Sequence, residues 1–179
     1  MEKNRKLSFE ELLNKMEQTK ADVCGKILDD FREEIEKLPG SRVKHQDWPG
    51  GYKDHVLETM NIAAILYETL NNKRKLEFTL SEALFILFIH DLDKIFRYAK
   101  DKFVVEDPHL FLIEFMKNKY GVEFSNKELN AIKYIHGENK DYHPTKRIML
   151  PLTAFVHCCD IISARIWFSE GRDKNWNEN

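Results

Sequence analysis

The sequence predicts an all-α protein, a helical bundle of about six to seven helices. Three observations predict it: apolar residues recur at helical spacing, capping motifs mark several helix starts, and proline or glycine marks helix ends. Phe103–Val105 is the one strand-like segment. With 179 residues the chain is long enough for one hydrophobic core, so we expect a single domain over residues 1–171.

Two helices are predicted in an N-terminal part, residues 8–38. Ser8 and Glu11 have the spacing of a capping box that opens the first helix, roughly Phe9–Gln18. The second helix, Ala21–Lys37, has regularly spaced apolar residues and is stopped by Pro39-Gly40.

The two middle helices follow an irregular segment, Ser41–Tyr52. The turn Pro49-Gly50-Gly51 leads into a third helix from about Asp54 to Leu70. Ser81-Glu82 opens a fourth helix, whose apolar residues are too continuous for a surface helix. The sequence therefore places this fourth helix at the centre of the fold.

Capping signals delimit the C-terminal helices. Asp107 as N-cap and Pro108 in the first helical position open the fifth helix, which Gly121 ends. Ser125 and Glu128 have the spacing of another capping box. The sixth helix reaches His136-Gly137, the last covers roughly Met149–Phe168, and the polar tail 172–179 follows.

Composition excludes several classes of protein. The net charge of −2 and the pI near 6.4 argue against a dedicated nucleic-acid or membrane-surface binder. Cys24, Cys158 and Cys159 are odd in number and form no C-x-x-C motif, which fits a reducing cytoplasm. The longest apolar run, Ala83–Ile89, is too short to cross a bilayer, and the N-terminus lacks a signal-peptide pattern. We expect a cytoplasmic protein; homo-oligomerisation stays open.

His90-Asp91, at the end of that apolar run, is the most informative feature for function. A buried imidazole and carboxylate are costly unless something compensates their lost hydration. A divalent metal does so, because both groups are natural metal ligands. Residues of the same types occur elsewhere in the chain, and they are His55, His109, His136 and Asp160.

Each of these residues also has an interpretation that requires no metal. His55 can lie on the surface or cap a helix, and His109 can be solvated in a first turn. His90 and His136 can each interact with the carbonyls at a helix C-terminus. Asp160 is the hardest to explain otherwise, because it lies in the middle of an apolar helix where a carboxylate needs a cation.

Taken together, four segments resemble the HD-domain superfamily of metal-dependent phosphohydrolases. They are Gly50–His55, Phe88–Lys94, Ala131–His136 and His157–Arg165. The resemblance covers Trp48–Trp167, so an HD-type helical core is expected at about 48–168. The chain departs from the family at Asp93, where relatives often have glycine.

The resemblance implies a set of site residues. His55, His90, Asp91 and Asp160 would bind a first metal. Asp91 would bridge to a second metal completed by His109 and His136. In the family pattern Asp91 and Lys94 would be catalytic, with Lys94 facing the substrate phosphate; Lys94 can instead be a solvated lysine at a helix end. His157 lies three residues before Asp160 on the same helix face and is a third catalytic candidate. It can donate a hydrogen bond to a metal ligand, act as a general acid or be a core histidine.

The cofactor expected is one or two divalent ions, because nitrogen and oxygen ligands suit Mn, Fe, Co, Ni or Zn. Lys53, Lys94, Arg97 and Arg165 are candidate phosphate clamps. The irregular segment Arg42–Tyr52 is expected to select the substrate, with Trp48 or Tyr52 stacking on a base. Both rings can instead belong to the core or cover the helix start.

The function expected is therefore hydrolysis of a nucleotide or a related small phosphate ester or anhydride, by attack of metal-activated water at phosphorus. Alternatives within the same chemistry are a phosphodiesterase acting on a cyclic nucleotide or an oligonucleotide 3′ end, and a diadenosine polyphosphate hydrolase. Alternatives from other classes are a non-catalytic nucleotide-binding module and a di-iron oxygenase.

Overall fold

The computed structural model describes residues 5–42, 45–99 and 106–166, and these residues form helices and loops without a strand. The all-α prediction is confirmed. The segment Phe103–Val105 and the tail 172–179 lie outside the described residues. Within the described ranges, no helix has both the length and the apolar composition that a membrane crossing requires.

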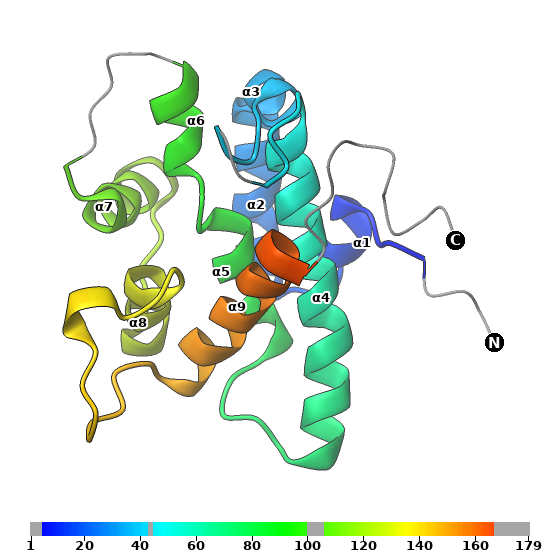
Figure 1. Ribbon diagram of the computed structural model, residues 1–179. Helices are drawn as coiled ribbons and strands as arrows, with labels where there is room; N and C mark the ends of the chain where they lie inside the picture. Colours follow the sequence, from blue (N-terminus) through cyan, green and yellow to red (C-terminus); the bar gives the residue numbers. More distant parts are fainter. Residues whose placement is uncertain (1–4, 43–44, 100–105, 167–179) are drawn as a thin grey trace.

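The helices succeed one another along a single chain path (Figure 1). In order they are α1 (Phe9–Leu13), α2 (Gln18–Asp30), α3 (Arg32–Lys37), α4 (Gly51–Lys73), α5 (Leu80–Ile89), α6 (Asp93–Ala99), α7 (Pro108–Tyr120), α8 (Asn126–Tyr134) and α9 (Pro151–Ile161). A short 3₁₀ turn, Asn139–Asp141, precedes α9, and a π-helical turn, Ile162–Ile166, continues it.

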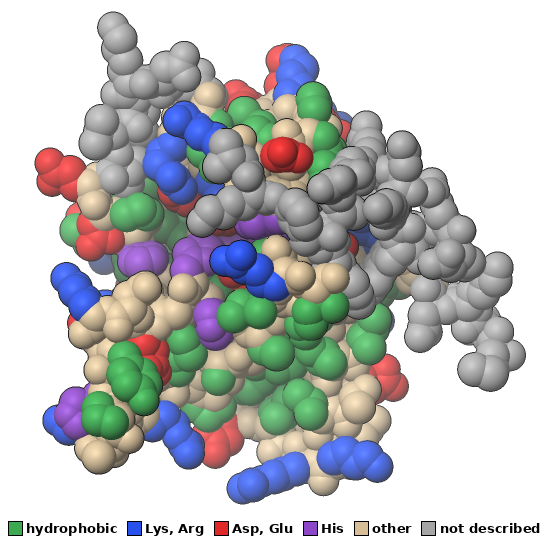
Figure 2. Space-filling view, viewed as in Figure 1, with side chains coloured by type: hydrophobic (Ala, Val, Ile, Leu, Met, Phe, Trp, Pro, Cys, Tyr) green, Lys and Arg blue, Asp and Glu red, His purple; other side chains and the backbone are tan. Residues whose placement is uncertain are grey.

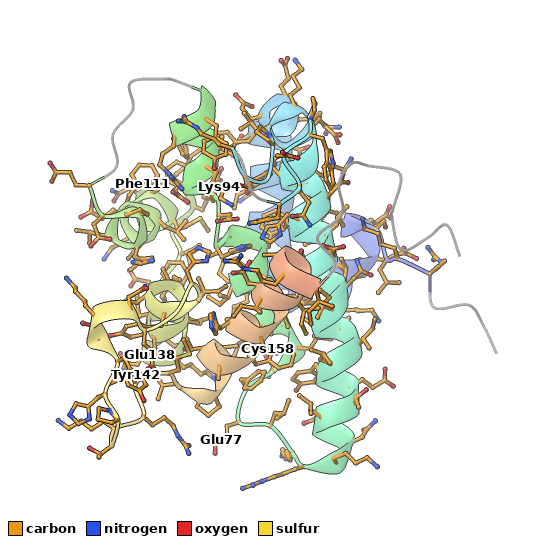
Figure 3. All side chains as sticks on the ribbon, in the orientation of Figure 1. Glu77, Lys94, Phe111, Glu138, Tyr142 and Cys158 are labelled. Atoms are coloured by element: carbon orange, nitrogen blue, oxygen red, sulfur yellow. The ribbon has the colours of Figure 1, made fainter. Side chains whose placement is uncertain are left out.

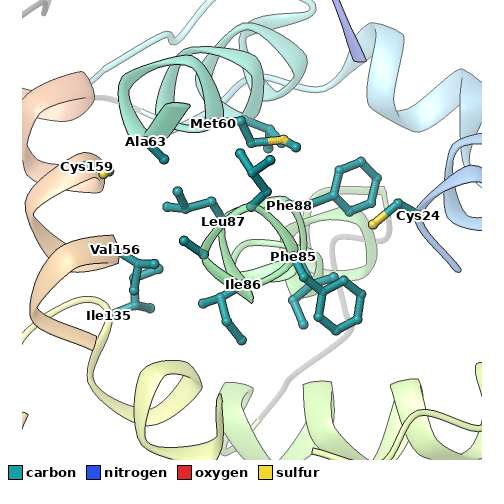
Figure 4. Close-up of a cluster of buried hydrophobic side chains, with 14 of the residues drawn as sticks. Cys24, Met60, Ala63, Phe85, Ile86, Leu87, Phe88, Ile135, Val156 and Cys159 are labelled. Carbon is teal, nitrogen blue, oxygen red and sulfur yellow. The ribbon is translucent and has the colours of Figure 1, made fainter. Parts of the chain in front are cut away.

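Helix α5 is the centre of the fold, as the sequence predicts. Its residues from Ser81 to Ile89 are all buried, and it packs against α2, α4, α8 and α9. Cys24 from α2, Met60 and Ala63 from α4, and Val156 and Cys159 from α9 lie around the central helix with its Leu87 and Phe88 (Figure 4). The helix begins at Leu80, one residue before the predicted Ser81, because Thr79 and Glu82 form the capping box. Ser81 instead accepts a hydrogen bond from the Glu17 amide at 2.8 Å.

The N-terminal part differs from the prediction of one long second helix. The chain leaves helical geometry at Phe31, whose φ and ψ are −124° and 28°, so that α2 and α3 are separate. The Phe31 ring lies 5.5 Å from the Phe96 ring and 6.1 Å from the Phe115 ring. Packing between distant segments therefore overrides the apolar periodicity of Ala21–Lys37.

Helix α6 is absent from the sequence prediction. The chain turns at His90-Asp91 and resumes as a helix at Asp93. An Arg97–Asp93 ion pair with 2.5 Å between Nε and Oδ2 spans one turn of α6 and supports it. The interruption of the apolar run by His90-Asp91 thus marks the boundary between two helices.

The remaining capping predictions are confirmed. Asp107 accepts hydrogen bonds from the first amides of α7, and Gly121 ends that helix with a φ of 67°. Ser125 and Glu128 form the predicted capping box of α8. Helix α8 ends at Tyr134, so His136 lies just beyond it.

Candidate metal centre

The candidate site lies where α4, α5, α8 and α9 converge. His55 is in the second turn of α4, and His90-Asp91 follows the last residue of α5. His136 follows α8, and Asp160 is near the end of α9. Histidine side chains gather in the middle of one face of the molecule, with Lys and Arg side chains beside them (Figure 2).

A close approach of backbones sets the start of α4 and thus the position of His55. Gly50 has a φ of 83°, which favours glycine. A Cβ atom on Gly51 would lie 1.9 Å from the Gln46 carbonyl oxygen, so no larger residue fits there. The predicted turn at Pro49-Gly50-Gly51 therefore also holds the preceding segment against the helix.

Three buried side chains form a compact group of ligand atoms. His55, His90 and Asp91 each offer one atom, and these atoms lie within 4.8 Å of one another. Asp91 Oδ2 is 3.6 Å from His55 Nε2 and 3.3 Å from His90 Nε2. This geometry can hold a metal ion, which confirms the prediction that these three residues meet.

Asp160 closes the opposite side of this group. Its Oδ1 atom is 3.2 Å from His55 Nε2 and 3.8 Å from His90 Nε2. Its other oxygen, Oδ2, is 3.3 Å from His136 Nδ1, and His136 Nε2 is 3.6 Å from Asp91 Oδ1. Both carboxylates thus place one oxygen beside the two buried histidines and the other beside the more exposed His136.

The hydrogen bonds of the two buried rings suit metal binding. His90 Nδ1 donates to the Leu87 carbonyl at 2.7 Å, and His55 Nδ1 is 3.0 Å from Ser163 Oγ. The opposite nitrogen of each ring, Nε2, is buried and has no hydrogen-bond partner among the described residues. A buried nitrogen without a partner is costly, and a cation bound between these nitrogens and the carboxylates would remove that cost.

The electrostatics of the site favour a cation. Burial lowers the pKa of His55 to about 4, so this ring is neutral at pH 7. Burial alone would raise the pKa of Asp91, but His90 and Lys94 hold it well below its usual value. Burial also lowers the pKa of His90, and Asp91 and Asp160 outweigh that effect and raise it.

Lys94 supplies the positive charge nearest to Asp91. Its Nζ atom contacts Asp91 Oδ2 and donates to the Gly40 carbonyl at 2.7 Å. Lys94 lies in the first turn of α6 (Figure 3) and is largely buried, with 12% of its side chain exposed. It therefore links the site to the loop before α4.

The other cations that the sequence analysis selected have protein partners or lie apart. Arg97 pairs with Asp93, and Lys53 pairs with Glu36 at 2.6 Å. Arg165 is exposed on the π-helical turn after α9. None of these three, among the described residues, forms an ion pair with the carboxylates of the site.

Trp48 and Tyr52, the two rings predicted to stack on a base of the substrate, do not share one exposed surface. Trp48 is partly exposed, and its Nε1 donates to Asp54 Oδ2 at 2.8 Å. Tyr52 is buried with 3% exposure, in line with the alternative that it covers the start of α4. Of the segment Arg42–Tyr52, residues 43 and 44 lie outside the described residues.

Two further histidines were predicted as site residues. His109 is on α7 and has 39% of its side chain exposed; its Nδ1 atom lies 3.8 Å from Asp107 Oδ1. His157 Nδ1 donates to the Ile135 carbonyl, the residue before His136. His157 therefore ties α9 to the segment that carries His136, and neither ring pairs with Asp91 or Asp160 among the described residues.

Sequence reasoning missed four residues that surround His55. His45 lies in the irregular segment but was not selected as a site residue; its ring is 4.8 Å from the His55 ring. Ser163 contacts the His55 ring directly, and Glu58 accepts hydrogen bonds from Ser163 and from Gln46, which in turn contacts His45. The histidine just before the Pro-Gly-Gly turn was the one signal in the sequence that could have indicated them.

Comparisons with known proteins do not assign this chain to a family. No family model, no curated protein and no solved structure matches it. The site geometry and its chemistry are therefore the basis for a function.

Proposed function

We propose that the chain is a metal-dependent phosphohydrolase of the HD type, acting on a nucleotide or a related small phosphate ester or anhydride. The observation that carries the proposal is the convergence of His55, His90, Asp91 and Asp160, with two buried Nε2 atoms that lack a hydrogen-bond partner in the described part of the chain. The order of these residues along the chain is also the order implied by the HD-domain resemblance.

The first ion would be held by the Nε2 atoms of His55 and His90 together with Asp91 Oδ2 and Asp160 Oδ1. His136 faces the remaining oxygen of each carboxylate, at 3.6 and 3.3 Å, which supports a second ion bridged by Asp91. With 46% of its side chain exposed, His136 lies on the solvent side. A substrate would therefore approach the centre next to His136.

A bound divalent metal supplies a water of lowered pKa and neutralises charge on a phosphate oxygen. The protein's part is to hold the ligands in place and to keep the centre dry on its inner side. His55, His90 and Asp91 are at most 5% exposed, whereas 46% of the His136 side chain is exposed, so among these four residues His136 is the one most open to water. Lys94 keeps Asp91 ionised and oriented.

A hydrolysis screen tests the proposal. The full chain is incubated with a panel of nucleoside mono-, di- and triphosphates and cyclic nucleotides, each with Mn²⁺, Co²⁺ or Zn²⁺, and phosphate or nucleoside release is measured. We expect turnover with at least one pair, and none with Asp91→Ala. The matched control is Asp29→Ala, which removes an exposed carboxylate on α2 and should retain full activity.

Two outcomes would contradict the proposal. Nucleotide binding without turnover under any metal would identify a binding module. Purification with iron together with oxygen consumption would identify an oxygenase. In either case circular dichroism must first show that the wild-type protein and Asp91→Ala have the same helical content.

A further inference from the structure

Glu58 is a carboxylate in the inner part of the fold that the proposed reaction does not use. It lies on α4, three residues after His55, and is partly buried. Its Oε2 atom accepts a hydrogen bond from Ser163 Oγ at 2.5 Å and another from Gln46 Nε2 at 2.8 Å. Each of these two donors in turn contacts a histidine ring.

The first branch runs through Ser163 to His55. A hydroxyl has one hydrogen, and Ser163, which is fully buried, gives it to Glu58. Ser163 Oγ must then accept from His55 Nδ1, 3.0 Å away. In the neutral ring the proton is therefore on Nδ1, and Nε2 keeps the lone pair that a metal needs.

The second branch runs through Gln46 to His45. A carboxylate only accepts, so the amide nitrogen of Gln46 faces Glu58 and its amide oxygen faces His45 Nδ1, at 2.6 Å. His45 Nδ1 must be the donor, and its Nε2 atom also keeps a lone pair. The same carboxylate oxygen thus determines both rings.

The backbone at Gln46 shows that this arrangement is held in place. Gln46 has a φ of 42°, a conformation that is unfavourable for a residue other than glycine, and its side chain is buried. Its carbonyl accepts from the Gly40 amide at 2.8 Å. This backbone conformation places the preceding residue, His45, with its ring 4.8 Å from the His55 ring.

We propose that Glu58 is the positioning residue of the metal centre, and that it fixes His55 through Ser163 and His45 through Gln46 in the tautomer with an unprotonated Nε2. His45 is thereby a further nitrogen donor beside His55, available to a divalent cation or to its bound water. The proposal rests on the metal-binding part of the proposed function. It does not depend on which phosphate compound is hydrolysed.

His90 provides an internal control. Its Nδ1 atom donates to the Leu87 carbonyl within its own helix, so its tautomer does not depend on Glu58. A general loosening of the site would affect all three rings. Loss of the Glu58 carboxylate should affect only His45 and His55.

The tautomers are measured by long-range ¹H–¹⁵N NMR on the metal-free full chain at about pH 8.5, well above the usual pKa of histidine. Signals are assigned by replacing each histidine singly. In Glu58→Ala we expect His55 and His45 to shift from the Nδ1–H form toward the Nε2–H form, with His90 unchanged. Glu58→Gln, which keeps an acceptor oxygen, should retain the wild-type tautomers, and Glu68→Ala, an exposed glutamate on the same helix, should have no effect.

Metal affinity gives a second readout. Titration with Co²⁺ or Zn²⁺ should show roughly 10- to 100-fold weaker binding for Glu58→Ala and near wild-type binding for Glu58→Gln. If Glu58→Ala does not fold, Ser163→Ala decides, since it should alter the tautomer of His55 and leave that of His45. Unchanged tautomers of His55 and His45, or an equal change in His90, would overturn the proposal. Both measurements are made without substrate. A wild-type protein that hydrolyses no phosphate compound would therefore contradict the proposed function but not the role of Glu58.

Discussion

Asp160 Oδ1 lies 3.2 Å from His55 Nε2 and so joins α9 to the start of α4. Ser163, one turn after Asp160, contacts the other nitrogen of the same ring at 3.0 Å. Helix α9 and the π-helical turn that continues it therefore place one side chain near each nitrogen of His55. The site consequently forms only when α4 and α9, which are distant in the sequence, have packed together.

Metal stoichiometry should separate His136 from His109. Because His136 faces oxygens of both Asp91 and Asp160, His136→Ala should lower the bound metal by about one equivalent. His109→Ala should leave it unchanged, since the ionic neighbour of His109 is Asp107 on its own helix. Elemental analysis after dialysis against Mn²⁺ measures both; a loss in His109→Ala would instead support the pairing of His109 with His136 implied by the family resemblance.

Acid should destabilise the metal-free protein through His55. Its pKa is about 4 in the folded protein and 6.5 as the reference value, so between these values the unfolded chain binds a proton that the folded chain does not. Stability is therefore lost as the pH falls, by about 2 kcal/mol between pH 6.5 and pH 5. His90, whose pKa is raised, contributes stability that is already complete below 6.5 and is lost only at higher pH.

Urea unfolding with EDTA at several pH values measures this dependence. His55→Asn, which has no titrating ring, should lose most of the slope between pH 6.5 and pH 5. A replacement of the exposed His143 should leave the slope intact. An equal slope in His55→Asn and the wild-type protein would show that other groups cause the acid sensitivity.

The central position of α5 predicts a large effect of Leu87→Ala. Leu87 is fully buried in the core, between helices α4 and α9 that carry His55 and Asp160. Removing its side chain should lower the free energy of unfolding by about 2–5 kcal/mol. Ile65→Ala on α4, where 45% of the side chain is exposed, should cost much less. Thermal or urea unfolding of the two variants gives the comparison, and similar losses would contradict the central placement of α5.

The sequence predicted those parts of the fold that depend on local chemistry. Capping at Asp107 and Ser125 and the continuous apolar content of α5 are local signals, and the structure confirms them. The break at Phe31 could not be predicted in this way, because it arises from contacts with Phe96 and Phe115, which are distant in the sequence.

The candidate site also has parts that local sequence signals predict and parts that only packing between distant segments determines. The cost of burying His90-Asp91 and Asp160 could be read from their apolar neighbours, and the structure brings them together with His55. The hydrogen-bonded support from Glu58 could not, because glutamate on an amphipathic helix usually faces water. Only the packing of α9 and of the loop at Gln46 against α4 gives that carboxylate its partners.

Substitution of Lys94 tests whether its charge stabilises Asp91 in the folded protein or only binds a substrate phosphate. Its contact with Asp91 places an ammonium group beside a carboxylate that is 2% exposed. Burial alone would lower the pKa of Lys94, and the Asp91 carboxylate outweighs this effect and raises it. The two charges therefore stabilise each other in the metal-free protein.

Lys94→Met keeps most of the side-chain length and removes the charge, which leaves Asp91 without its nearest cation. We expect the metal-free variant to be less stable by about 3 kcal/mol, the typical cost of removing one partner of a buried pair. Because a divalent ion would supply the missing charge, saturating Mn²⁺ should remove most of this deficit. Lys119→Met, whose ion pair with Asp30 is exposed, is the control and should change stability by less than about 1 kcal/mol. Urea unfolding with and without Mn²⁺ measures the stability of both variants and of the wild-type protein. If metal-free Lys94→Met is as stable as the wild-type protein, the charge of Lys94 acts only on a substrate.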